Sequence, residues 1–335
     1  MRRLAAFLIL AFAAVCVAAL VSFSWIKAEV DRPGPRREPV RIVFKSGASL
    51  EQIANQLAEA GALRHPTIFR LAARFERVAR HLKAGEYEVE GRASQRDILD
   101  MLVAGRTYVR RLTIPEGLSV QEVITLLSTA DGLVGAVNDL PPEGRLLPDT
   151  YHYAFGDTRA GLVARMRQKM DRFLEKAWQS RRPGLPLKNS EQTLVLASIV
   201  EKETARADER PRVAAVFLNR LRKGMRLQSD PTVIYGITLG QRPLGRRLTR
   251  KDVEAPTDFN TYTIAGLPPH AIANPGRASI EAVLDPLASK DLYFVADGKG
   301  GHAFAETLAA HNKNVARWRR LRKKASGANR KSTTP

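Results

Sequence analysis

Leu194-Val-Leu-Ala-Ser-Ile-Val-Glu201-Lys-Glu203-Thr204 is an apolar helical run that ends on two carboxylates. Because successive residues of a helix are separated by about 100°, Glu201 shares a face with Leu194 and Ala197, and Glu203 points roughly 200° away from it. A carboxyl group held against apolar surface loses hydration when it ionises, so it keeps its proton more readily. We therefore expect Glu201 to be a candidate general acid.

Two start signals precede this helix. Asn189 can cap it, with Gln192 three residues later, or Ser190 can cap it alone. A plainer interpretation is that both glutamates are ordinary surface charges at a helix end, with Glu203 paired to Arg206. Spacing alone favours this plainer interpretation, so other parts of the chain have to decide.

The composition limits the class of protein. A chain of 335 residues, 44% of them hydrophobic, has material for two globular domains. The sole cysteine, Cys16, lies in the N-terminal apolar segment, so we expect no disulfide, thiolate nucleophile or cysteine zinc site in the folded part. The six histidines show no ligand spacing, and we therefore expect neither a metal nor a cofactor.

The N-terminal segment predicts a membrane anchor. Leu4 to Ile26 is 23 residues without a charge, long enough to cross a bilayer and longer than the apolar core of about 7 to 15 residues in a cleaved signal peptide. We expect an uncleaved, single-pass transmembrane helix over 4–26 in the cytoplasmic (inner) membrane, with residues 1–3 in the cytoplasm. Basic residues follow the segment as well as precede it, so the positive-inside count does not support this orientation. A large domain after a first helix is nevertheless often exported, and we expect the folded part on the periplasmic, extracytoplasmic side.

A short repeat follows the anchor. Residues 27–39 are rich in proline and predict a stiff spacer that lifts the folded part off the membrane. At an offset of 70 residues, 42–57 matches 112–127, each copy reading as a strand, a glycine turn, a serine cap and an amphipathic helix. A looser copy runs from Tyr87 to Met101.

The repeat unit resembles the LysM-like module, a small glycan-binding fold, and we assign residues 40–107 to it. A generic strand-turn-helix unit that binds nothing is an equal alternative, because the motif is short.

The remaining patterns predict a second, mixed domain over 108–318. A long helix is expected over 156–178 with Leu162, Met166 and Met170 on its core face, and Pro211 opens a further helix. A short helix is expected from Thr249, and 292–295 is expected to be a buried strand. Alternating short strands and helices are typical of an α+β fold.

Several motifs together carry a resemblance to a known family. They are, in chain order, Pro148-Asp149-Thr150-Tyr151, Ala197-Ser-Ile-Val-Glu201-Lys-Glu-Thr204, Phe217-Leu-Asn219-Arg220-Leu221, Met225-Arg-Leu-Gln228-Ser-Asp230-Pro231-Thr232-Val-Ile-Tyr235, Asn260-Thr-Tyr262-Thr-Ile264, Gly266-Leu-Pro268-Pro269 and Tyr293-Phe-Val295. The chain from Val40 to Trp318 is similar to the YceG-like endolytic murein transglycosylases (MltG). The similarity is strongest after Glu191.

The resemblance implies a membrane-anchored lyase, a lytic transglycosylase that cuts nascent peptidoglycan strands between N-acetylmuramic acid and N-acetylglucosamine and so terminates their elongation in cell wall biogenesis. Glu201 matches the family's catalytic glutamate. It would protonate the leaving oxygen and then act as base on the C6 hydroxyl, which closes a 1,6-anhydro ring. One acid/base carboxylate is enough for this chemistry, so Glu201 needs no partner carboxylate.

Polar residues downstream are candidates for contacts with the sugars. Gln228, Asp230, Tyr235, Asn260 and Tyr262 lie in loop-like segments and are equally suited to binding acetamido and hydroxyl groups or to holding the scaffold. Glu203 is expected to be a structural charge that pairs with Lys202 or Arg206.

The formal net charge of +20 is concentrated at the C-terminus, where nine basic residues follow the last acidic residue, Glu306. We expect a basic, disordered tail over 319–335, with an electrostatic arm for anionic surfaces as the alternative. The chain carries no recognised nucleic-acid motif, and we expect no nucleic-acid partner.

Two functions from different classes fit these features. One is the transglycosylase, with peptidoglycan strands, the membrane and peptidoglycan synthases as partners. The other is a non-catalytic scaffold that binds glycan and recruits partners of cell-wall synthesis.

Overall fold

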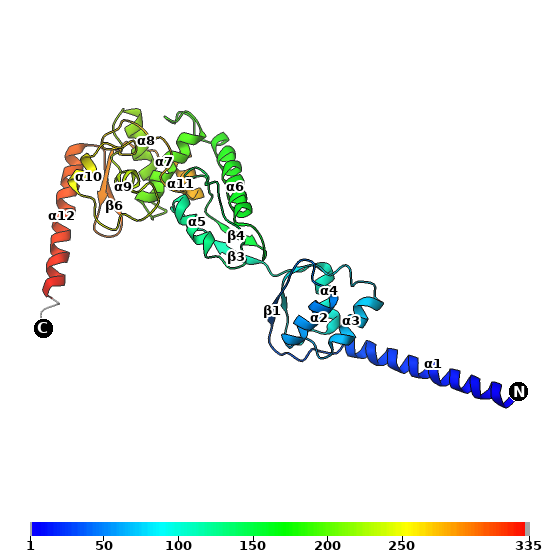
Figure 1. Ribbon diagram of the computed structural model, residues 1–335. Helices are drawn as coiled ribbons and strands as arrows, with labels where there is room; N and C mark the ends of the chain where they lie inside the picture. The colour runs from blue at the N-terminus through cyan, green and yellow to red at the C-terminus, as the bar shows by residue number, and fades with distance from the viewer. Residues whose placement is uncertain (1, 332–335) are drawn as a thin grey trace. The chain divides into compact units, whose positions relative to one another are not determined.

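The computed structural model describes residues 2–331, with side chains for residues 3, 4 and 6–323. The chain divides into two compact units. Unit 1 contains residues up to 111 together with 131–133 and 152–157, and unit 2 contains 112–130, 134–151 and the residues from 158 onward. Figure 1 labels the elements of both units.

Unit 1 consists of one long helix, a two-stranded sheet and three short helices. Its elements are α1 (Arg2–Val30), β1 (Val40–Phe44), α2 (Leu50–Glu59), α3 (Pro66–Phe75), β2 (Gly85–Val89) and α4 (Gln95–Ala104). β1 and β2 pair antiparallel, with Val40 opposite Val89 and Phe44 opposite Gly85. The helices bury their apolar faces against this sheet, and Phe44, Phe69 and Tyr87 lie fully buried among them.

Serine capping boxes begin three of the helices, as the repeat predicts. The Ser49 hydroxyl accepts from the backbone N–H of Gln52 at the start of α2, and Ser94 and Ser119 do the same at the starts of α4 and α5 (Val120–Ser128). In each box the third helical residue reaches back to the serine N–H, so two otherwise unpaired donors are satisfied. The serine caps of the repeat are confirmed.

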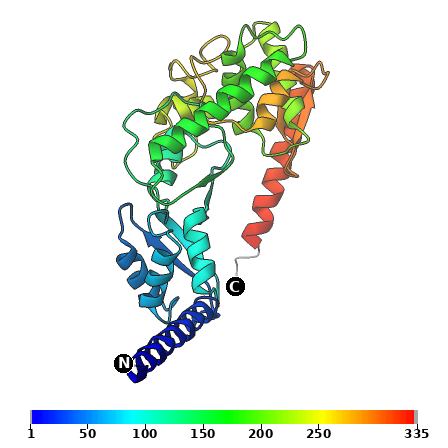
Figure 2. The ribbon, with the colours of Figure 1, turned by 90° about the vertical axis from the view of Figure 1, so that its right-hand side faces the viewer.

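α1 does not end in a spacer. The helix continues to Val30, which is buried in the core of unit 1 beside the buried Glu29. The side-chain amide of Gln95, at the start of α4, donates to the carbonyl oxygen of Glu29 at 3.3 Å. In Figures 1 and 2 the helix runs directly into the folded part of unit 1. The expected spacer over 27–39 is therefore corrected, because burial of the last helical turn fixes α1 to the unit.

Unit 2 holds most of the remaining elements. They are α5, α6 (Arg159–Gln179), α7 (Ser190–Glu203), α8 (Arg210–Arg222), α9 (Asp230–Thr238), α10 (Arg250–Glu254), α11 (Arg277–Leu284), β5 (Tyr293–Ala296), β6 (His302–Ala305) and α12 (Leu308–Lys331). β5 and β6 pair antiparallel. The chain passes between the units through β3 (Arg110–Thr113) and β4 (Thr150–Tyr153), which form another two-stranded sheet.

α7 is the central helix of unit 2. Every residue from Thr193 to Val200 is buried, and α6, α8, α9 and α11 all contact the helix. A helix that is apolar all round belongs inside a core, so α7 is buried on all sides rather than along one stripe. It therefore places its C-terminal carboxylates at the edge of the core.

Several expected elements are present with altered limits. α6 buries Leu162, Met166 and Met170 as expected, and proline opens α8. The strand β5 lies one residue later than expected and is only partly buried. The mixed helix and sheet content agrees with the expected class, although each sheet among the described residues has only two strands.

The basic C-terminal segment is helical as far as the structure describes it. α12 extends to Lys331, so the expectation of a disordered tail from 319 is corrected up to that residue. Its composition explains the helix, because Ala, Arg and Lys are strong helix formers. Residues 332–335 of the expected tail lie outside the described residues.

Candidate functional site

The end of α7 points its two glutamates into different surroundings. The helix begins at the first of its two expected start signals, where the Asn189 side chain accepts a hydrogen bond of 2.9 Å from the backbone N–H of Gln192. From this fixed start, the helical repeat directs Glu201 and Glu203 to opposite sides. Within the described residues, the two carboxyl groups accept hydrogen bonds from different donors.

Glu201 lies among hydrogen-bond donors. Its Oε2 accepts from the backbone N–H of Gly276 at 3.0 Å and from the Ser279 hydroxyl at 2.7 Å, both from the start of α11. The Arg210 guanidinium lies 4.0 Å from its Oε1, and the side chain is 7% exposed. This polar setting differs from the apolar surface that the helical spacing predicts. Glu201 thus fastens α11 to the end of α7.

A further carboxyl group lies close to Glu201. Burial raises the pKa of Glu116, and the charge of Glu201 raises it further, whereas Arg210 lowers it. Glu116 also lies against Gly276, so a side chain at position 276 would collide with the carboxyl group of Glu116. This end of α11 therefore combines two acids and one buried arginine.

Glu203 lies in a different setting, where its carboxyl group is largely surrounded by protein. The Ser229 hydroxyl donates a hydrogen bond to its Oε1. Burial raises the pKa of Glu203 to about 7, and the charge of Asp230 adds to this effect, although Ser229, His302 and Arg220 act in the opposite direction. The residue keeps some exposed surface. Its largely enclosed carboxyl group therefore holds a proton near neutral pH.

Three of the predicted sugar-contacting residues gather beside Glu203. The Tyr262 hydroxyl donates a hydrogen bond of 2.7 Å to Oδ1 of Asp230. Burial raises the pKa of Tyr262, and the charges of Asp230 and Glu203 raise it further. Gln228 and Asp230 flank Ser229 and are exposed, and Oε1 of Gln228 accepts from Arg220 at 3.3 Å. We call Glu203, Arg220, Gln228, Ser229, Asp230 and Tyr262 the Glu203 cluster.

Asn260 has the scaffold role that was the alternative to sugar binding. Its side-chain amide donates to the carbonyl oxygens of Val253 at 2.9 Å and Ala255 at 2.6 Å, and its Oδ1 accepts from the backbone N–H of Tyr262 at 2.9 Å. The side chain has no exposed surface. Asn260 therefore holds the loop that carries Tyr262.

Tyr235 lies apart from the Glu203 cluster, in a group of rings with Phe259 and His270. Its ring centroid lies 4.9 Å from that of Phe259 and 5.7 Å from that of His270. Its hydroxyl donates to Oε2 of Glu143 at 3.4 Å. Burial raises the pKa of Tyr235, and Glu143 adds to this effect.

Glu143 is a half-buried acid that the sequence patterns do not predict. Burial raises its pKa to about 7, although the backbone N–H of Val120 donates to Oε1 at 2.8 Å and Tyr235 also donates to it. Tyr235 also lines a cavity of about 430 Å³, together with Gly117 and Lys202. The glutamate stands in a polar, proline-rich stretch with no periodic pattern, so its burial depends on segments distant in sequence.

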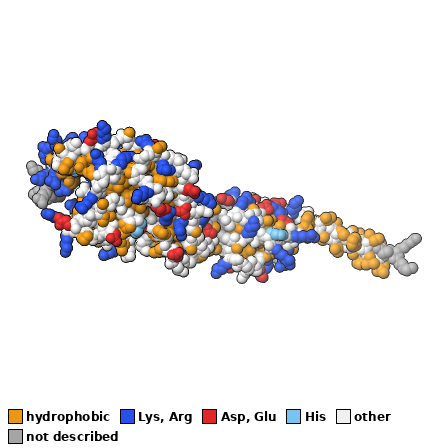
Figure 3. All heavy atoms as spheres, turned by 90° about the horizontal axis from the view of Figure 1, so that it is seen from above, with side chains coloured by type: hydrophobic (Ala, Val, Ile, Leu, Met, Phe, Trp, Pro, Cys, Tyr) orange, Lys and Arg blue, Asp and Glu red, His pale blue; other side chains and the backbone are white. Residues whose placement is uncertain are grey.

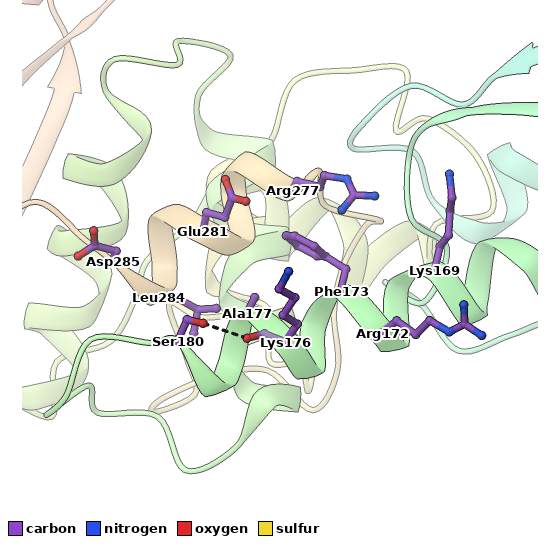
Figure 4. A pocket seen from close by; sticks show the side chains of 10 residues that line it. All are labelled: Lys169, Arg172, Phe173, Lys176, Ala177, Ser180, Arg277, Glu281, Leu284 and Asp285. Atoms are coloured by element: carbon purple, nitrogen blue, oxygen red, sulfur yellow. Dashed lines mark hydrogen bonds between the residues drawn. The ribbon is translucent and has the colours of Figure 1, made fainter.

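A basic pocket of about 610 Å³ lies between α6 and α11. Figure 4 shows Arg277 from α11 and Lys176 from α6 beside the ring of Phe173, with Lys169 and Arg172 further along α6. The Arg277 guanidinium lies 4.6 Å from the centre of that ring. Neither glutamate at the end of α7 lines this pocket, so it is separate from the Glu203 cluster.

No group of three or more metal-ligating side chains occurs within residues 3–323 whose side chains the structure describes. One helix among the described residues, α1, is long and apolar enough to cross a membrane.

Known proteins are similar to this chain in both sequence and fold. Endolytic murein transglycosylases from Streptococcus pneumoniae are 29% identical to this chain in an alignment 325 positions long, which covers 83% of this chain and 58% of their own length. The endolytic murein transglycosylase of Bacillus subtilis is 28% identical and is covered to 83% of its length. A crystal structure of a putative YceG-like protein from Listeria monocytogenes matches with a TM-score of 0.50 and 29% identity, over 83% of this chain and 99% of that one.

The chain therefore spans little more than half the length of the streptococcal relatives. The model of the YceG-like family matches residues 42–317, which include parts of both units. The chain belongs to the YceG-like family.

Proposed function

We propose that this protein is an endolytic lytic transglycosylase that cleaves peptidoglycan strands between N-acetylmuramic acid and N-acetylglucosamine. Family membership and the names of the relatives support this activity. The observation that carries the chemistry is a carboxyl group whose pKa burial raises to about 7, beside the exposed polar residues Gln228 and Asp230. Such a group holds a proton near neutral pH and can release it.

We propose that one of the two glutamates at the end of α7 is the acid/base residue, and that the geometry favours Glu203. The resemblance names Glu201, whose carboxyl group is engaged by two donors from α11 and faces Arg210. Among the described residues, Glu203 accepts from the Ser229 hydroxyl. Glu203 is also the glutamate that lies beside the predicted sugar-binding residues Asp230 and Tyr262.

In the proposed reaction, the Glu203 proton moves to the glycosidic oxygen as the bond from that oxygen to C1 of the muramic acid breaks. The resulting carboxylate then takes the proton of the C6 hydroxyl while the C6 oxygen bonds to C1. This closes the 1,6-anhydro ring and returns Glu203 to its protonated form. No water is consumed, and one carboxyl group serves both steps.

The position of the catalytic unit relative to the membrane is part of the proposal. α1 provides the length and hydropathy of a single-pass anchor, and no charge interrupts it between Leu4 and Lys27. We place the N-terminus in the cytoplasm and the folded units on the periplasmic side, where nascent strands leave their synthases. Cleavage there ends the elongation of a strand.

Unit 1 is proposed to hold the glycan strand as a LysM-like module. The order β1, α2, α3, β2 with an antiparallel strand pair supports this assignment. Peptidoglycan synthases are the proposed partners, since they supply the uncrosslinked strand.

The test is product analysis by mass spectrometry after incubation of the full chain, in detergent, with uncrosslinked peptidoglycan. We expect products that end in anhydromuramic acid, and we expect Glu203→Gln to lower the rate at least about 100-fold, the usual contribution of a general acid. Glu201→Gln keeps the acceptor oxygen for Gly276 and Ser279, so this variant separates the structural role from proton transfer. Glu191→Gln, an exposed change at the other end of the same helix, is the matched control.

Loss of activity in Glu201→Gln with full activity in Glu203→Gln would return the acid role to Glu201. Binding of glycan without any anhydro product from the parent chain would instead favour the non-catalytic scaffold. Reducing ends alone would indicate hydrolysis.

A further inference from the structure

An exposed apolar surface lies on unit 1, beside the end of α1. Phe75 at the end of α3 is 71% exposed and Leu71, one turn earlier, is 47% exposed. The Phe75 ring lies 5.6 Å from the ring of Phe23 on α1, which is 50% exposed. Large apolar side chains this exposed on a folded module mark an interaction surface. We call Phe23, Leu71 and Phe75 the α1–α3 face.

A cavity of about 420 Å³ lies between the two helices behind this face. Ile26 and Val30 of α1 and Ala72 of α3 form part of its apolar lining, and Arg96 lies at its polar edge. Arg96 pairs there with Glu76, which also lines the cavity, and with Asp31 at 3.5 Å. The cavity is therefore largely apolar toward α1, where Ser22 and Lys27 are its polar lining, and its charged groups toward α3 and α4 are paired with each other.

The position of the α1–α3 face along the membrane normal depends on how α1 joins the core of unit 1. Val30 is buried in the core of the unit, and Ile26, one turn earlier, packs against the same core. The core of unit 1 therefore begins where the uncharged part of α1 ends, with no extended segment between them. With a rise of 1.5 Å per residue, the 23 uncharged residues span about 34 Å, close to the roughly 30 Å thickness of a bilayer's hydrocarbon region.

Phe23 lies three residues, or about 4.5 Å, further toward the bilayer than Ile26. The ring of Phe75 lies 5.6 Å from that of Phe23, so an α1 that crosses the bilayer as proposed brings Phe75 near the edge of the hydrocarbon region. Figure 3 shows apolar side chains along the visible face of α1. Leu71 and Phe75 add exposed apolar side chains from α3.

Basic side chains border the α1–α3 face. Lys27 follows Ile26 in the last turns of α1, and Arg74 precedes Phe75 on α3. Both are exposed, and neither forms an ion pair within the described residues. Long basic side chains beside an apolar surface reach toward lipid phosphates at the level of the headgroups.

We propose that the α1–α3 face is embedded in the edge of the bilayer that α1 crosses. Lipid acyl chains fill the cavity between α1 and α3 and cover Phe75 and Leu71, and headgroup phosphates meet Lys27 and Arg74. Unit 1 is thereby held against the membrane surface in a fixed orientation. The inference rests on α1 as the proposed membrane anchor and is independent of which glutamate is catalytic.

The experiment measures the membrane depth of spin labels on the full chain reconstituted in phosphatidylethanolamine and phosphatidylglycerol vesicles. Collision with oxygen reports the hydrocarbon region, and collision with a water-soluble nickel chelate reports the aqueous phase. Cys16 is the sole cysteine and is exposed on α1, so the labelled parent chain reports whether α1 is inserted. Phe75→Cys and Leu71→Cys, each with Cys16→Ser, report the depth of the α1–α3 face.

Ala84→Cys, also with Cys16→Ser, is the matched control on the same unit. Ala84 is exposed and lies next to Lys83, which donates to the carbonyl oxygen of Ala104 at the end of α4. The start of α4 contacts α1 through Gln95, whereas Ala84 lies beside the other end of this ten-residue helix, which is about 15 Å long. We expect a label at position 75 to have a several-fold higher ratio of oxygen to nickel collisions than a label at position 84.

A label at position 16 in hydrocarbon with a label at position 75 in water overturns the proposal and leaves the anchor intact. Equal depth at positions 75 and 84 also overturns it, because the whole unit would then adsorb without a preferred face. Water exposure at position 16 overturns the anchor and the proposal together, while the product analysis on soluble strands still tests the enzyme. Ready formation of a disulfide between two chains of the Phe75→Cys, Cys16→Ser variant assigns the face to a second copy instead of lipid.

Discussion

The hydroxyl of Ser279 donates a hydrogen bond of 2.7 Å to the carboxyl group of Glu201, and this bond joins the first turn of α11 to the last turn of α7. Ser279 has no exposed surface, so the bond is shielded from water. Two segments that are 78 residues apart in the sequence therefore meet at the edge of the core.

Ser279→Ala should lower the free energy of unfolding by about 1–3 kcal/mol, because it leaves an oxygen of a largely buried carboxyl group with one donor fewer. Denaturant unfolding of the parent and the variant measures the change. Ser180→Ala, which removes an exposed hydroxyl that bonds to the last turn of its own helix, is the control and should change stability by less than about 0.5 kcal/mol. Equal stability of the parent and Ser279→Ala contradicts a structural role for the bond.

The rate of glycan cleavage should fall as the pH rises above about 7. The pKa of Glu203 is raised to about 7, so the proton that it donates to the leaving oxygen is lost over that range. The pH profile of kcat/KM measures this. Ser229→Ala removes the donor that lowers this pKa, so the fall should begin at a higher pH in the variant. A profile that is flat from about pH 6 to 9 would exclude Glu203 as the acid.

Folding stability should also depend on pH through the half-buried acid Glu143. Its pKa is raised to about 7 in the folded state, above its ordinary value of 4.5, so the folded protein holds a proton that the unfolded chain has released between these values. The contribution of Glu143 is fully present below pH 4.5 and is lost as the pH rises through about 7.

Glu143→Gln removes this titration, and its stability relative to the parent should therefore rise between about pH 5 and pH 7. Unfolding measured across that range provides the comparison, with exposed Glu254→Gln as the control. A constant difference between the parent and Glu143→Gln at all pH values would show that Glu143 does not titrate in this range.

Asn260→Ala should destabilise unit 2 by about 2 kcal/mol or more. The change removes three hydrogen bonds and leaves the carbonyl oxygens of Val253 and Ala255 and the N–H of Tyr262 without their buried partner. Thermal and denaturant unfolding measure the loss. Tyr262→Phe is the informative comparison, because it removes only the bond to Asp230.

We expect Tyr262→Phe to lower stability by less than about 1.5 kcal/mol and to affect glycan cleavage more than folding. Parental activity in Tyr262→Phe would contradict this prediction and would show that the Tyr262 hydroxyl has no role in cleavage.

Local features of the structure could be predicted from the sequence. Asn189 caps α7, Ser49 caps α2 and the apolar spacing of α6 selects its buried face, because caps and helical periodicity depend on residues within a few positions of one another. The long helix α6, the proline that opens α8 and the strand β5 were predicted from the same kind of local pattern. The opposite directions of Glu201 and Glu203 are also a local property of one helix.

Only the tertiary structure decided what surrounds those two carboxyl groups. Glu201 meets Ser279 from α11, Glu203 meets Ser229 from the segment before α9, and Glu143 lies 92 residues from the tyrosine that bonds to it. Burial and the charge of distant neighbours set the pKa of a carboxyl group, and neither is encoded in local spacing. The same reason explains α1, whose composition fixes its length as a helix, whereas its attachment to unit 1 depends on a core built from residues far along the chain.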